Sequence, residues 1–96
     1  MSIKQIREGD NWVEGKYKGY FFQAKVYCFV SEYGINEGHV SKLWVSKKGQ
    51  TVLNYDRGWD VGEELIKTTF APLLVKLEKF AKSKAFSKSL GIVEGR

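Results

Sequence analysis

The chain has 96 residues and carries 16 lysines and arginines against 11 aspartates and glutamates, a net charge of +5. This length fits one domain with one modest core, and a single cysteine excludes an internal disulfide and favours a reducing, cytoplasmic setting. The longest apolar runs are too short to span a bilayer, and the charged N-terminus leads us to expect no signal peptide. The positive charge favours anionic partners, although lysine-rich surfaces are also simply soluble.

Residues 1–10 hold only two isoleucines among polar side chains, which predicts an N-terminal arm or one helical turn. Residues 11–17 alternate weakly between apolar and polar side chains and predict a first strand. The pair Lys18-Gly19 then predicts a tight turn, because glycine readily adopts the positive φ that such turns require.

The strongest strand pattern covers residues 20–30, where β-branched and aromatic residues dominate. Because side chains of a strand point alternately to opposite faces, the pattern predicts one wholly apolar face that a helix can cover. The other face mixes aromatic rings with a lysine and a glutamine. The predicted apolar face comprises Phe22, Ala24, Val26, Cys28 and Val30, and the mixed face comprises Phe21, Gln23, Lys25, Tyr27 and Phe29.

Residues 31–38 are predicted to form a glycine-bent loop, since the glycine spacing does not fit a phosphate-binding loop and the glutamates would repel an anion. His39 has no neighbouring nucleophile in sequence and is predicted to be an ordinary half-exposed residue. Residues 39–47 and 50–56 predict two further strands, with a tight turn between them. Lysine is a poor first residue for that turn, so a longer loop with a bulge is the alternative.

Alternation along residues 39–47 divides their side chains between the two faces of the sheet. Leu43 and Val45 are expected on the apolar face, with Val40, Lys42 and Trp44 on the mixed face.

After residue 56 the alternation stops, and the run Arg57-Gly58-Trp59 predicts a structural corner. Asp60, with Glu63 three positions later, fits a capping box at a helix start. Apolar residues then recur at helical spacing, and Pro72 predicts either a kink or a break near residue 68 with the proline in the first turn of a second helix.

These patterns predict an α+β domain at residues 1–90. It has a four-stranded antiparallel β-meander in the order 1-2-3-4, followed by one long, proline-kinked C-terminal helix packed on one face. Residues 91–96 lose the helical period and are predicted to be a disordered tail, which looks similar to the remnant of an engineered protease site.

The acidic residues Asp56, Asp60 and Glu63 offer oxygen ligands for a divalent metal, as in a small metal-dependent hydrolase. Against this, Asp60 is explained as a helix cap and Arg57 can neutralise Asp56. No nucleophile lies next to a base and no histidine or cysteine cluster has metal-ligand spacing, so we expect neither an enzyme nor a cofactor.

The mixed face has three interpretations. The N-terminal arm or the end of the chain covers it and makes a second core; or it is an exposed platform for a partner; or it is a homodimer face. If a nucleic acid is the partner, the rings stack on unpaired bases while lysines meet phosphates, or the sheet enters the major groove of a duplex. Lysines on the predicted helix would add contacts, or would simply suit its macrodipole. The candidate contact residues are Phe21, Lys25, Tyr27, Phe29, Lys42, Trp44, Lys47, Lys48, Lys76 and Lys79.

Three stretches of the chain carry a family resemblance: SEYGI at 31–35, GHVSKLWV at 38–45 and NYDRGWD at 54–60. They resemble a group of small proteins from Gram-positive bacteria and their phages that is classed as a domain of unknown function. The likeness covers roughly the first two thirds of the chain. It implies a phage or mobile-element setting and no catalytic residues.

The leading hypothesis is therefore a small phage-type protein without enzymatic activity that binds a nucleic acid or a nucleic-acid-processing protein of the host, as an inhibitor. The alternative is a structural or assembly protein that forms a homodimer through its aromatic face. We expect no membrane partner.

Overall fold

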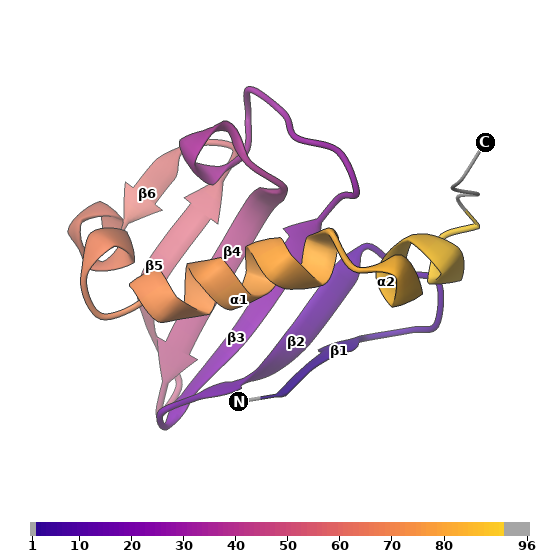
Figure 1. Ribbon diagram of the computed structural model, residues 1–96. Coiled ribbons are helices and arrows are strands. Elements are labelled where there is room, and N and C mark those ends of the chain that lie inside the picture. Colours follow the sequence, from indigo (N-terminus) through magenta and orange to yellow (C-terminus); the bar gives the residue numbers. More distant parts are fainter. Residues whose placement is uncertain (1, 92–96) are drawn as a thin grey trace.

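A computed structural model describes residues 2–91, which form one antiparallel sheet of six strands with helices on one face (Figure 1). Each strand pairs with the next one in sequence, in the order β1-β2-β3-β4-β5-β6. The strands are β1 (Ser2–Gln5), β2 (Trp12–Tyr17), β3 (Tyr20–Val26), β4 (Val40–Lys47), β5 (Gln50–Asp56) and β6 (Trp59–Val61). The helices are η1 (Ile35–Glu37), η2 (Glu63–Lys67), α1 (Ala71–Ala81) and α2 (Lys84–Ser89).

Both predicted tight turns are confirmed. Lys18 and Gly19 have φ angles of +48° and +85°, and Lys48 and Gly49 have +51° and +80°. Two left-handed residues in succession are the type I′ arrangement, which matches the twist of the flanking strands. A register shift between Val45 and Ser46 leaves Val52 of β5 as an extra residue, so a bulge accompanies the two-residue turn, and the longer loop that was the alternative does not form.

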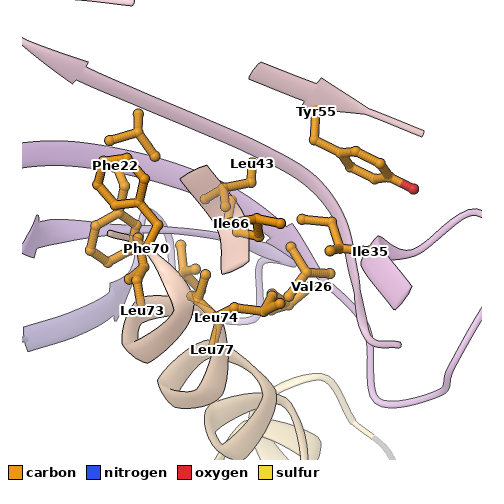
Figure 2. Close-up of a cluster of buried hydrophobic side chains, with 14 of the residues drawn as sticks. Phe22, Val26, Ile35, Leu43, Tyr55, Ile66, Phe70, Leu73, Leu74 and Leu77 are labelled. Atoms are coloured by element: carbon orange, nitrogen blue, oxygen red, sulfur yellow. The ribbon is translucent and has the colours of Figure 1, made fainter. Parts of the chain in front are cut away.

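The core lies between the sheet and α1 (Figure 2). Phe22 and Leu43 project from the centre of the sheet, and Phe70, Leu73 and Leu77 meet them from the helical layer. All five side chains are almost completely buried. The predicted apolar face of β3 and β4 is therefore the face that the helix covers.

The prediction of four strands is wrong, because the sheet has an additional strand at each edge. Both edge strands are short, and β1 contains one partly buried apolar residue, Ile3. An edge strand gains its backbone hydrogen bonds from one neighbour and needs little apolar surface of its own. Its pattern is therefore too weak to detect in the sequence.

Strand β3 ends at Val26 and not at residue 30. A bulge between Lys25 and Val26 shifts the register, so that Val40 lies opposite Val26 and is buried in the core. The prediction that placed Val40 on the mixed face is thus wrong. Val30, expected on the apolar face, is exposed in the β3–β4 loop (residues 27–39).

The prediction of a single long helix is also wrong. Trp59–Val61 forms β6, and Gly62, with a φ of +88°, separates this strand from η2, so Asp60 is not a helix cap. Helix α1 begins at Ala71 with Pro72 in its first turn, where the missing N–H costs nothing. A second break follows α1, and the Ser83 hydroxyl caps α2 by accepting a hydrogen bond from the Phe86 N–H.

The helices leave the opposite face of the sheet without a cover among residues 2–91. Figure 1 shows α1 crossing one face and α2 continuing towards the connection between β1 and β2. The shortest dimension of the domain is 18 Å, which accommodates a sheet and one layer of helices. The predicted tail begins at Gly91, and residues 92–96 lie outside the described residues.

Candidate functional site

The uncovered side of the sheet carries three large rings and two lysines, which we call the open face: Trp12, Phe21, Lys25, Lys42 and Trp44. All five side chains are half-buried. The strand register brings them together, because Trp12 lies opposite Lys25 and Lys25 lies opposite Lys42. Residues 2–5 extend the sheet at its edge as β1, so the N-terminal arm does not form a second core over this face.

The rings of the open face are held by neighbouring groups. Phe21 and Trp44 meet edge to face with their centroids 5.9 Å apart. The indole N–H of Trp44 donates a hydrogen bond of 2.8 Å to the Thr51 hydroxyl. Stacking surfaces that are already fixed lose little conformational entropy on binding.

The cations of the open face are crowded. Lys25 and Lys42 form a cross-strand pair of like charges, an arrangement that destabilises a sheet. Their ammonium groups lie 5.9 Å and 6.0 Å from the Trp12 ring, and Lys42 also contacts the Asp56 carboxylate at 3.5 Å. One carboxylate offsets only part of this charge. An anion placed here would therefore relieve repulsion that the free protein carries.

A pocket of about 500 Å³ opens at the corner where the open face meets the β3–β4 loop, and we call it the corner pocket. Lys25 and Lys42 contribute from the sheet, and Arg57 contributes from the turn between β5 and β6. The loop adds aromatic rings from Tyr27, Phe29 and Tyr33.

Two contacts from outside the β3–β4 loop hold it in place. The Tyr55 hydroxyl donates a hydrogen bond of 2.6 Å to the Tyr33 carbonyl oxygen, and burial raises the pKa of Tyr55 above its usual value. At the end of the loop, the Glu78 carboxylate on α1 accepts a hydrogen bond from the His39 backbone N–H and also contacts the Nδ1 atom of the His39 ring. His39 is buried by this contact and is not half-exposed as predicted.

The predicted contact residues do not all lie on one surface. Phe21, Lys25, Lys42 and Trp44 belong to the open face, and Tyr27 and Phe29 line the corner pocket beside it. Lys47 and Lys48 lie at the β4–β5 turn, at the other end of the sheet. Lys76 and Lys79 are exposed on α1, which covers the opposite face. A flat partner could not contact the helix lysines and the open face together.

Trp12 on the open face, and Tyr33 and Arg57 in the corner pocket, were not among the contact residues predicted from the sequence. Tyr33 lies in a loop that was predicted to be purely structural, and Arg57 was assigned to neutralise Asp56. The structure pairs Asp56 with Lys42 instead. The sequence signal for both residues was their position next to glycines, where exposed side chains are common.

The acidic residues considered as metal ligands are separated by their contacts. Asp60 accepts a hydrogen bond from the Asn54 side chain, and Asp56 pairs with Lys42. Within residues 2–91, no three His, Cys, Asp or Glu side chains are grouped closely enough to hold a metal ion. In the same part of the chain, no helix has the length and apolar character needed to cross a membrane.

The model of a family described as a domain of unknown function, DUF7678, matches residues 11–77, from just before β2 into α1. The match covers well over half of the chain, which therefore belongs to this family. The expected resemblance to an uncharacterised domain family is confirmed, while its range among Gram-positive bacteria and phages stays a prediction. No curated protein and no solved structure matched the chain significantly.

Proposed function

We propose that this domain is a non-enzymatic accessory protein of a phage or mobile element that binds single-stranded nucleic acid of the host through its open face. The observation that carries the proposal is the like-charged pair of Lys25 and Lys42 above the Trp12 ring, next to the Phe21–Trp44 pair. Rings between cations are the arrangement by which proteins stack unpaired bases and bind the adjoining phosphates.

The physical reasoning favours a single strand over a duplex. Stacking requires base faces that are not already paired, and the half-buried indole of Trp44 offers flat apolar surface at the level of the sheet, beside the Trp12 ring that lies beneath the two lysines. A smaller hollow of about 160 Å³ has both indoles and Lys42 in its lining, together with Asp56. A hollow lined in part by rings suits a splayed base better than the smooth edge of a base pair.

The test is fluorescence anisotropy with a labelled oligothymidine of about 16 nucleotides, a length that covers the usual span of a single-strand site. We expect binding that weakens as salt rises. The double variant Lys25→Glu/Lys42→Glu should lose at least about tenfold in affinity, and the salt slope should become shallower by about 1.4 if two phosphate contacts are lost.

The matched control is Lys76→Glu/Lys79→Glu, which makes the same change in net charge on the helical layer. This control should retain most of the affinity. Equal weakening by both double variants would mean that net charge alone, and not the open face, attracts the strand. Absence of binding to the wild-type protein at low salt would refute the proposal.

Light scattering at two protein concentrations belongs to the same experiment. A dimer that the Trp44→Ser variant dissociates would support the alternative, an assembly protein whose aromatic face contacts a second copy. A monomer at both concentrations would argue against that alternative.

A further inference from the structure

We propose that the corner pocket binds the terminal nucleotide of the strand, with the terminal phosphate monoester on its cations and the base against its rings. This inference rests on the proposed function for the rest of the strand, which would lie along the open face. The pocket itself has chemistry that is distinct from that of the face.

The charge of the pocket selects for a dianion. Lys25, Lys42 and Arg57 line it, and no carboxylate of the described residues does. Among residues 2–91, Lys25 and Arg57 form no ion pair, and Lys42 shares its charge with Asp56. A phosphodiester within a strand carries one negative charge, whereas a terminal phosphate carries up to about two at neutral pH. Two uncompensated cations therefore match a terminal phosphate.

Arg57 lines the pocket from a turn in which its own backbone conformation is unfavourable. Its φ of +57° is left-handed, a conformation that disfavours any residue with a Cβ, and its N–H donates to the Ser41 carbonyl oxygen. A glycine would form this turn without strain. Lys18 and Lys48 have the same backbone conformation in their turns, so what distinguishes Arg57 is that it lines the pocket, where a guanidinium can bind phosphate through two parallel hydrogen bonds.

The rings of the pocket are exposed but anchored. Phe29 and Tyr33 are 69% and 54% exposed, which is unusual for large rings on a small domain. The hydrogen bond from Tyr55 to the Tyr33 carbonyl holds this part of the loop against the sheet. Ring surfaces presented beside cations fit a planar base that is joined to a phosphate.

The size and position of the pocket agree with a terminal nucleotide. Its volume of about 500 Å³ lies within the range of about 300–1,000 Å³ that is typical of small-ligand sites. It lies at the corner of the sheet and shares Lys25 and Lys42 with the open face. A strand that runs along the open face can therefore end in the pocket.

The experiment compares oligothymidines that carry a 5′-phosphate, a 3′-phosphate or no terminal phosphate, in the anisotropy assay. We expect one of the phosphorylated strands to bind about tenfold more tightly than the unphosphorylated strand. Arg57→Gln should abolish this preference and leave the affinity for the unphosphorylated strand within about twofold. The control Lys48→Gln changes another basic residue with a positive φ, at the opposite end of the sheet, and should retain the preference.

The outcomes separate this inference from the proposed function. If all three strands bind the wild type equally, or if Arg57→Gln weakens them all alike, the inference is wrong and the proposed function stands. If no strand binds, the proposed function is wrong, and adenosine 5′-monophosphate then tests the pocket alone by NMR. Shifts at the Tyr33 and Arg57 amides that Arg57→Gln removes would support a site for free nucleotides, and their absence would overturn the inference.

Discussion

Glu78 joins α1 to the first residue before β4, and removing it should loosen a contact between segments that are far apart in sequence. One carboxylate oxygen accepts from the His39 backbone N–H at 2.8 Å, and the other lies 2.6 Å from the His39 Nδ1. The two side chains are only 23% and 10% exposed, so water replaces this contact poorly. We call this contact the Glu78–His39 bridge.

The expected cost of Glu78→Ala follows from these two contacts. A hydrogen bond to a charged group contributes about 1.5–3 kcal/mol, and leaving a buried donor unpaired adds to the loss. Alanine returns a few tenths of a kcal/mol in helix propensity, and partial access of water lowers the cost further. We expect a loss of about 2–4 kcal/mol, which for a domain of this size lowers the Tm by roughly 10–25 °C.

Glu78→Gln should be milder than Glu78→Ala. The amide oxygen can accept from the His39 backbone N–H, while the amide NH₂ donates to Nδ1 of the neutral ring that carries its proton on Nε2. Both contacts survive without charge, so less than half of the alanine loss should remain. Urea unfolding of the wild type and both variants measures the difference.

Glu64→Ala is the control, since Glu64 is an exposed acid on η2 and its loss should change stability by less than about 0.5 kcal/mol. The reasoning would be refuted if Glu78→Ala cost no more than this control. A glutamine variant as unstable as the alanine variant would show that the charge, and not the hydrogen-bond geometry, carries the contribution.

Three further predictions concern the sheet and the short helix. Because burial raises the pKa of Tyr55, the neutral phenol stabilises the fold below pH 10.0, the pKa of an unfolded tyrosine, and stability should fall as the pH rises above that value. In thermal melts, Tyr55→Phe should lose less Tm than the wild type between about pH 9 and pH 11. At Gly15, a Cβ would overlap the backbone of β1, so Gly15→Ala should lower the free energy of unfolding by about 1–3 kcal/mol and speed hydrogen exchange of the β1 amides. Gly58 has open space around it, so Gly58→Ala should change neither stability nor exchange in β1. Ser83→Ala removes the cap on the Phe86 N–H and should cost about 1 kcal/mol, with faster exchange confined to α2. Unchanged exchange across α2 would contradict the assigned cap.

Local patterns predicted the central part of the sheet. The alternation in β3 and β4 assigned Phe22 and Leu43 to the covered face, and both type I′ turns lie where Lys-Gly pairs occur. These features depend on residues that are neighbours in sequence, so a single chain is enough to predict them. The position of Pro72 in a first helical turn was likewise one of two alternatives that its ring geometry allowed.

The site could be predicted only in part. The sequence indicated that rings and lysines share a face of β3 and β4, because period two is a local property. It could not indicate that Trp12 lies beneath both lysines, since that contact needs the β2–β3 register. Nor could it indicate that Arg57 and Tyr33, which are 24 positions apart in the sequence, line one pocket.

The sequence alone determined the charge of this protein, its central strands, its turns and the two kinds of side chain that alternate along them. Tertiary structure decided that short edge strands complete the sheet, that a bulge carries Val40 into the core, and that Glu78 reaches His39 across 39 positions. The physical reason is that a period or a turn is set by adjacent residues. An edge strand, a register shift or a pocket wall gains its free energy from partners that only the folded chain brings within reach.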